Sequence, residues 1–316
     1  SQHNIKLGYE YKHKNHHLET GFTYKHESIS ERAREWEYRD SSGYSMPHNP
    51  QALEVIYNLR GDNKISSNSI EMYLQDTWRK EMSKGILRVN YGVRLSYWTW
   101  NSECLISPRA SLAFVPKNND NMTFRLATGL YYQRPFYKEL RDTVTNGATT
   151  IVQLNKEILS QRSFQVIAAY EYRFKIGKRP FLFSTELYYK AQDRLNPYTV
   201  DNTKIVYYGH NCAKGNVMGA DFKLYGEFVP GTDSWLTFSL MRARMNLNGK
   251  NIPQPTDQTW SLNMFFSDYF PGTTRWKMNL KACFAGGLPF GTPHTGLEKH
   301  VFRSPAYKRV DVGLNF

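Results

Sequence analysis

Strict alternation of apolar and polar residues at the C-terminal end constrains the fold of this chain more than any other feature. From Val310 onward every second residue is apolar, and the last residue is an aromatic, Phe316. A period of two predicts a β-strand with one apolar and one polar face. Such a strand ends either a soluble β-sandwich, whose apolar face packs on a second sheet, or a transmembrane barrel, whose apolar face meets lipid. From this segment alone both folds stay open.

The same alternation recurs along the whole chain and predicts about thirteen strands. In residues 87–97, the clearest example, every odd position is apolar. Tight turns are predicted at residues 13–16, 81–84, 117–120, 177–179, 230–233 and 270–273, and longer connections at nearly every other crossing. Membrane barrels show this asymmetry, with short periplasmic turns and long surface loops. The pattern therefore predicts an all-β protein, an antiparallel transmembrane β-barrel, rather than a sandwich or a propeller.

Composition excludes several other classes of protein. The mean hydropathy is -0.61, and no apolar run is long enough for a transmembrane helix, so a helical membrane protein is excluded. Aromatic residues make up 15% of the chain, as expected where rings form belts at two membrane interfaces. The net charge of +13 is spread along the chain and no nucleic-acid-binding motif is present, so nucleic acid is not an expected partner. The three cysteines are too scattered for a disulfide framework or a zinc site.

Strand direction sets the expected topology. The final strand follows a long loop, so it runs from the surface to the periplasm, and an odd number of strands makes the first strand run the same way. Bacterial single-chain barrels have even numbers of strands and no open edges in lipid. Residues 1–316 are therefore predicted to be the barrel domain of an outer-membrane protein whose N-terminal strands lie outside this sequence. A long polar stretch from Glu27 to Asn68 is predicted to be one of the longer surface connections.

Several short segments resemble TonB-dependent outer-membrane receptors, in the form common in Bacteroidetes. The resemblance covers most of the chain from about Ser69 onward, and the first two strands match only in pattern. The segments are residues 87–94 (LRVNYGVR), 106–112 (ISPRASL), 127–133 (ATGLYYQ), 186–190 (ELYYK), 253–258 (PQPTDQ), 266–269 (FSDY) and 307–311 (YKRVD).

The resemblance implies a C-terminal part of a barrel of about 22 strands, with the plug domain absent from this sequence. It also implies TonB-dependent active uptake of a nutrient, such as a siderophore or a glycan, across the outer membrane of a Gram-negative cell. The implied partners are outer-membrane lipid and lipopolysaccharide, the TonB complex through the N-terminal part, and a surface lipoprotein. A passive porin or surface-binding barrel without energy coupling, and an outer-membrane hydrolase, are the alternatives, although no hydrolase motif is present.

Candidate substrate-binding residues are cationic or aromatic and lie on the predicted lumenal face or in surface loops. Arginine can bind carboxylates or phosphates, and rings can stack on sugars or planar ligands. The structural alternatives are ion-pair ladders for the arginines and membrane belts or loop packing for the rings. The lumenal and strand-end candidates are Arg88, Arg94, Trp98, Trp100, Arg125 and Tyr131, and the loop candidates are Trp36, Tyr38, Tyr44, Tyr137, Tyr198, Tyr207 and Tyr208.

Three further features carry predictions. Arg242 and Arg244 share a face with lipid-facing residues near the outer rim and are predicted to contact lipopolysaccharide phosphates. Phe316 resembles the C-terminal signal read by barrel-assembly machinery. His13, His16 and His17 lie at a periplasmic turn with no acidic residue in the turn itself, so a solvated turn is predicted rather than a metal site, and no cofactor is expected.

Overall fold

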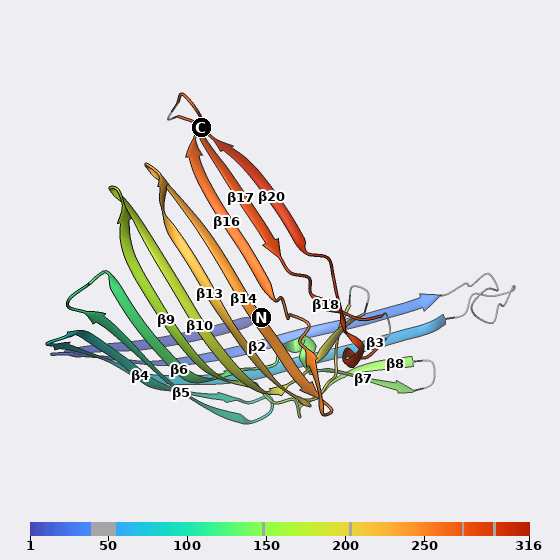
Figure 1. Cartoon of the computed structure of the whole chain (residues 1–316). Helices are drawn as coiled ribbons and strands as arrows, with labels where there is room; N and C mark the ends of the chain where they lie inside the picture. Colours follow the sequence, from blue (N-terminus) through green and yellow to red (C-terminus); the bar gives the residue numbers. More distant parts are fainter. Residues whose placement is uncertain (39–54, 147–148, 202–203, 274, 293–294) are drawn as a thin grey trace.

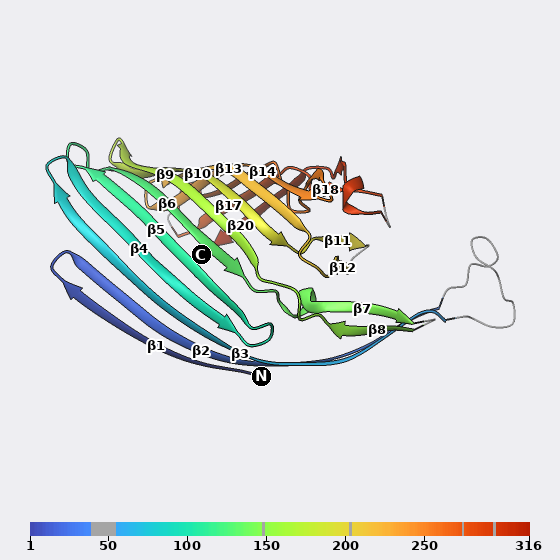
Figure 2. The same cartoon turned by 90° about the horizontal axis from the view of Figure 1, so that it is seen from below.

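One continuous sheet dominates the molecule. The structure is a computed structural model that describes residues 1–38, 55–146, 149–201, 204–273, 275–292 and 295–316. Thirteen strands follow one another in the sheet, each antiparallel to the next. Figures 1 and 2 show that they form a tilted, strongly curved wall. In spatial order they are β1 (Gln2–His13), β2 (His16–Tyr38), β3 (Val55–Met82), β4 (Gly85–Trp98), β5 (Glu103–Pro116), β6 (Met122–Gln133), β9 (Gln161–Ile176), β10 (Arg179–Leu195), β13 (Ala213–Val229), β14 (Thr232–Leu247), β16 (Trp260–Tyr269), β17 (Lys277–Ala285) and β20 (Tyr307–Asn315).

The predicted all-β class, strand number and antiparallel order are confirmed. β1 and β20 form opposite edges of the strand order. Among the described residues, no helix has the length and apolar character that crossing a membrane requires.

The register of the strands places the alternating apolar residues in rows that run across the sheet. One cross-strand row joins Leu112, Leu126, Ala168, Leu187, Ala220 and Leu240. Leu126, Leu187 and Leu240 in this row are exposed, as residues that face lipid must be in the isolated chain. The next row along the same strands faces the other side, which is the lumen. Because side chains alternate with a period of two, a one-residue slip would turn every polar lumenal residue toward lipid, so the apolar rows specify the register.

The connections differ at the two ends of the strands. Six of the twelve hairpins close with tight turns at one end, at the positions predicted from sequence, and the longer connections lie at the other end (Figure 1). The longer ones contain short elements of their own, namely η1 (Tyr137–Leu140), β7 (Arg141–Asn146), β8 (Thr149–Leu154), β11 (Tyr198–Asp201), β12 (Lys204–Tyr207), β15 (Lys250–Pro253), β18 (Pro289–Phe290), η2 (Leu297–Lys299) and β19 (Phe302–Arg303).

The prediction of a long loop from Glu27 to Asn68 is wrong. β2 continues to Tyr38 and β3 begins at Val55, and the two strands stay paired in register far beyond the apolar rows. One face of this extension is partly buried, but it mixes apolar residues such as Leu59 and Ile65 with polar ones such as Ser67, so the apolar alternation fades while the backbone hydrogen bonds continue. β8 adds a short parallel contact to the extension, opposite Leu59 and Arg60 of β3.

The two clusters of buried apolar residues lie at the loop end of the wall. One cluster contains Leu195, Ala213, Met245, Leu247, Ile252 and Leu297. The other contains Ile65, Trp98, Leu140 and Ile158. The wall itself is one strand thick and exposes both faces, whereas the surface connections fold back on one another and bury a small core. The loops are therefore a packed structure on which a binding site can be positioned.

Candidate functional site

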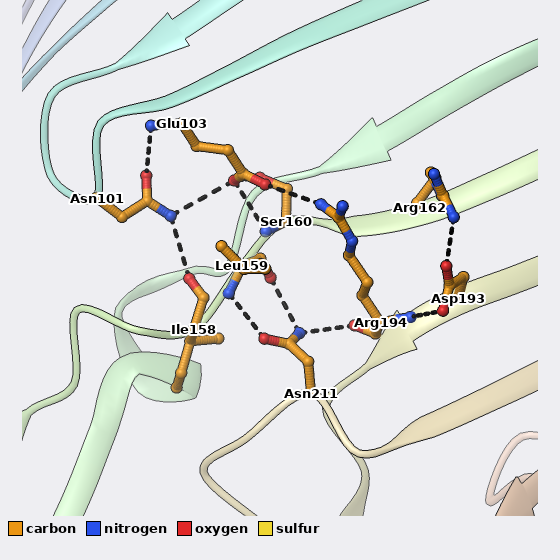
Figure 3. Close-up of polar contacts among 9 residues, drawn as sticks. All are labelled: Asn101, Glu103, Ile158, Leu159, Ser160, Arg162, Asp193, Arg194 and Asn211. Carbon is orange, nitrogen blue, oxygen red and sulfur yellow. Dashed lines mark hydrogen bonds and ion pairs between the residues drawn. The ribbon is translucent and has the colours of Figure 1, made fainter.

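A hydrogen-bonded network around the Glu103 carboxylate ties three surface connections together (Figure 3). Ser160 donates to it from its backbone nitrogen at 2.9 Å and from Oγ at 2.6 Å. Asn101 Nδ2 and Arg194 Nη1 each lie 3.4 Å from a Glu103 oxygen. Only 8% of the Glu103 side chain is exposed. Because a buried carboxylate needs several donors, Glu103 fixes the positions of the segments that supply them.

Asn211 extends this network across the next connection. Its Oδ1 accepts from the Leu159 backbone nitrogen at 2.7 Å, and its Nδ2 donates to the carbonyls of Leu159 at 3.0 Å and Arg194 at 2.7 Å. Arg194 has a φ of 57°, a left-handed conformation that a non-glycine residue adopts at a cost. Beside it, Asp193 pairs with Arg162 at 2.5 Å. The segments before β5, β9 and β13 and the end of β10 are thus locked together.

Four of the predicted aromatic candidates take part in loop packing. Trp98 is 8% exposed and donates from Nε1 to Ser67 Oγ at 3.2 Å. Trp100 packs against the same buried cluster, with the Lys156 ammonium 5.1 Å from its ring centroid. Tyr137 packs there too and donates to Glu31 Oε2 at 2.6 Å. Tyr208 packs against the second buried cluster.

The other aromatic candidates are more open. Trp36 lies on the β2 extension and is 64% exposed. Tyr198 and Tyr207 face each other across the β11–β12 hairpin, with ring centroids 5.7 Å apart. Tyr131 is half-buried at the surface end of β6. The side chain of Tyr38 and all of Tyr44 lie outside the described residues. Ligand contact by any of these rings remains a prediction.

The three lumenal arginine candidates differ in their partners. Arg125 forms an ion pair with Glu171 on the neighbouring strand β9. Arg94 lies 4.0 Å from Glu71. Arg88 is exposed and has no acidic partner among the described residues. The ion-pair alternative therefore fits Arg125 best, and Arg88 and Arg94 retain more capacity for an anionic ligand.

Arg242 and Arg244 separate in the structure although they were predicted as a pair. Arg242 is exposed at the edge of an outward hollow that also contains Leu187, Met218 and Leu240. Arg244 lies beside the β15 hairpin, and its buried Nε has no hydrogen-bond partner in the described part of the chain. Lipopolysaccharide contact remains a prediction for both residues, and the geometry favours Arg242. Phe316 is 83% exposed with its ring centroid 4.9 Å from that of Trp276, which leaves its predicted role in assembly untested.

The histidines at the first turn do have acidic neighbours, two of them on adjacent strands. His16 Nδ1 lies 2.6 Å from Asp76 on β3, and His17 lies 3.5 Å from both Glu10 on β1 and Glu19 on its own strand. Asp76 and Glu10 come close to these histidines through strand pairing, and Glu19 lies two residues from His17 along β2. Neighbouring side chains point to opposite faces of the wall, so the groups do not converge, and no metal-ligand cluster occurs in the described ranges.

Three important polar residues were not predicted from sequence. They are Glu103, Asn211 and the fully buried Asp257, which pairs with Arg303. Asp257 lies within the PQPTDQ segment that resembles TonB-dependent receptors, and this resemblance was the one feature of the sequence that pointed to it. Glu103 begins β5 directly after a turn and Asn211 lies in the connection before β13, where no periodicity marks the residues that will be buried.

Glu139 is a buried carboxyl group in η1, at the base of the loop cluster. It is 4% exposed, and its Oε2 has no hydrogen-bond partner among the described residues. Burial raises the pKa of Glu139 to about 7, although a hydrogen bond from Gln161 acts in the opposite direction. The carboxyl group is therefore protonated in the folded loop at a pH where an exposed glutamate is ionised.

This shift predicts that the loop is more stable at pH 5 than at pH 8. The folded loop binds more protons than the unfolded loop between the ordinary glutamate pKa and about 7, so stability falls as the pH rises through that window. After correction for intrinsic rates, hydrogen exchange at Tyr137–Leu140 should be faster at pH 8 than at pH 5. Glu139→Gln should remove the difference, and the exposed Glu157→Gln should preserve it. An equal pH effect in Glu139→Gln would contradict this assignment.

The comparisons with known proteins agree with this architecture. A sequence model described as TonB dependent receptor-like, β-barrel, matches residues 2–316. The siderophore receptor PirA from Acinetobacter baumannii is similar in structure, with a TM-score of 0.64 at 13% identity over 99% of this chain and 47% of PirA. A G324V mutant of the ferric enterobactin receptor PfeA from Pseudomonas aeruginosa gives 0.64 at 12% identity over 99% of this chain and 45% of PfeA. The ferric yersiniabactin uptake receptor FyuA from Yersinia pestis gives 0.60 at 10% identity over 99% of this chain and 46% of FyuA.

The chain thus spans about half the length of these solved receptors, and at such low identities they show the fold alone. Among curated proteins no match is found. The comparisons do not distinguish the form common in Bacteroidetes, which stays a prediction. The matched family is one of outer-membrane receptors and transporters rather than enzymes, and its barrel lies in the outer membrane. By the match over residues 2–316, the chain belongs to the TonB-dependent receptor-like β-barrel family.

Proposed function

We propose that this chain is part of an outer-membrane receptor that takes up a nutrient by TonB-dependent active transport. The observation that carries the proposal is the wall with two different faces. Its apolar face suits lipid, and its lumenal face carries arginine, tyrosine and carboxylate side chains beneath a packed cluster of loops. Surface loops held rigidly above a polar lumen can bind a solute weakly at several points, as transport requires.

The complete receptor in this proposal contains more than this chain. The solved receptors are about twice as long, which supports earlier strands, a plug and a TonB-binding segment N-terminal to residue 1. Because the three solved receptors are named for siderophores, ferric siderophores are the first solutes to test beside glycans. Coupling to the TonB complex and contact with a surface lipoprotein are further parts of the proposal.

A genetic experiment separates active uptake from passive diffusion. Uptake of a panel of ferric siderophores and glycans is measured in the parent strain, in a deletion of the complete gene, and in a strain lacking TonB. Loss of the same solute in both mutants is the expected result. Loss in the gene deletion alone would support the passive porin, and unchanged uptake of the whole panel would reject the proposal. The lipoprotein partner is tested separately: the receptor is purified from membranes without detergent exchange, and a lipoprotein that co-purifies with it would support the contact.

Contact with lipopolysaccharide predicts a specific effect of charge at Arg242. This side chain is exposed above the apolar hollow, where acyl chains and a phosphate group would lie together. Arg242→Glu should reduce the lipopolysaccharide that co-purifies with the receptor by roughly fivefold, because each basic residue near an anionic surface contributes about 1 kcal/mol. Arg275→Glu, at a turn on the opposite side of the membrane, is the matched control and should change nothing. Equal lipopolysaccharide in both variants would disprove the contact.

A further inference from the structure

A hollow in the lumenal wall brings two arginines from neighbouring strands together. Arg94 of β4 pairs with Ser107 of β5, and Arg109 of β5 pairs with Gly92 of β4. The two arginines are therefore diagonal neighbours on the same face. They line one hollow. Only Arg94 was a candidate from the sequence pattern, and Arg109 was not.

Each of these arginines lies over a tyrosine ring. The guanidinium carbon of Arg94 is 5.8 Å from the centroid of the Tyr73 ring. That of Arg109 is 4.4 Å from the centroid of the Tyr131 ring. A guanidinium stacked on an aromatic face is held in place through its flat surface, and its N–H edge stays available for an acceptor. The closer contact holds Arg109 at its ring before any ligand arrives, and Arg94 lies near the outer limit of the cation–π range.

Glycines on the same face make room for these stacks. A Cβ at Gly21 would lie 2.3 Å from an atom of the Tyr73 ring, so Tyr73 can lie flat only over a glycine. A Cβ at Gly129 would lie 3.0 Å from both Arg109 Cγ and the Tyr131 ring. Glycine in a strand interior weakens the strand, and a close approach of other groups is a common reason for it. The two glycines therefore leave the space that the Tyr73 and Tyr131 rings occupy.

Among the described residues, arginines outnumber carboxylates around this hollow. Glu71, 4.0 Å from Arg94, also lies 3.6 Å from Arg134, so one carboxylate faces two guanidinium groups. Arg109 has no acidic partner within the described ranges. Glu19, also at the hollow, accepts a hydrogen bond from Gln75 at 2.6 Å and lies 3.5 Å from His17. Neighbouring like charges on a strand face are destabilising unless an anion lies between them.

We propose that Arg94 and Arg109 form a binding station for the carboxylate or phosphate groups of the transported solute. The inference rests on the proposed function and adds a substrate class to it, an anionic solute that contacts the lumenal wall during passage. Two guanidinium edges oriented toward one hollow can each bind a carboxylate or a phosphate group through paired hydrogen bonds. Arg125, neutralised by Glu171 on the same wall, lacks this capacity.

The test measures anion binding to the purified full-length receptor in detergent by calorimetry, with citrate and inorganic phosphate as probes. Citrate or phosphate should bind the unaltered receptor, and Arg109→Gln should weaken that binding at least about tenfold. Arg109→Lys, which keeps the charge but loses the planar fork, should fall between the two. Arg32→Gln, an equal charge change on the exposed β2 extension, should bind as the unaltered receptor does.

Three results would overturn the station. Neither probe binds the unaltered receptor, or Arg109→Gln binds as tightly as the unaltered protein, or Arg109→Gln lowers the melting temperature without changing binding. The last result would mean that a carboxylate of the same polypeptide, lying in the lumen, neutralises Arg109. Anion binding is measured on purified protein and does not depend on the uptake experiment. The genetic test can therefore support or reject TonB-dependent uptake without deciding whether Arg94 and Arg109 bind an anion.

Discussion

Replacing Asp257 with alanine should lower the stability of the folded receptor by about 1–3 kcal/mol, because it leaves the buried backbone N–H of Ala243 without its acceptor and removes the ion pair with Arg303. None of the Asp257 side chain is exposed, and its Oδ2 pairs with Arg303 Nη2. Its Oδ1 accepts from the Ala243 backbone nitrogen at 2.6 Å. Arg303 also donates from Nη1 to the Asp257 carbonyl at 2.6 Å. One carboxylate thus joins β14 to two different surface connections.

The measurement is thermal unfolding of the full-length receptor in detergent, followed by the loss of its compact form on gels. Asp62→Ala is the matched control, because Asp62 forms an ion pair with Arg32 at 3.4 Å but its side chain is 73% exposed. An exposed pair contributes less than about 1 kcal/mol, so the control should melt almost with the unaltered protein. Equal melting of the two variants would show that the Asp257–Arg303 pair has no structural role.

The comparison of Asp257 with Asp62 also shows what sequence patterns can and cannot reveal. The wall could be predicted almost completely, since each strand carries its own period-two signal and each apolar residue pairs with another across the sheet. Thirteen strands, their directions and the tight turns all follow from that signal. Nothing in the local sequence separates a carboxylate that will be buried from one that will remain exposed.

The errors have the same physical origin. The β2–β3 extension lacks a clear apolar alternation because its partly buried face mixes apolar and polar residues, although the backbone pairing persists. Asp76, the acidic neighbour of His16, lies on a strand that is distant in sequence. The role proposed for Arg109 depends on Tyr131, two positions from its register partner Gly129 on β6. Contacts of this kind across strands and loops are not encoded by periodicity.

The second large effect is expected at Glu103. Glu103→Ala should break the loop network and lower the free energy of local loop opening by about 3 kcal/mol. Hydrogen bonds to a charged group contribute about 1.5–3 kcal/mol each, and the variant loses several. Ser160, which has no exposed surface, would lose its acceptor for both the backbone nitrogen and Oγ. Hydrogen exchange in the full-length receptor should accelerate at residues 155–160 and 208–212, which the network joins. The strand ladders should keep their protection, because the network lies beyond their ends.

Two variants make this result specific. Glu103→Gln keeps an acceptor for Ser160 but loses the charge that Arg194 faces, so its exchange should lie between those of Glu103→Ala and the unaltered receptor. Glu157→Ala removes an exposed carboxylate from the same connection and should leave exchange unchanged. If the Glu103 network positions the loops for a solute, Glu103→Ala should also weaken solute binding more than Glu157→Ala does. Loops that stay protected without the Glu103 carboxylate would instead be held by the buried apolar clusters alone.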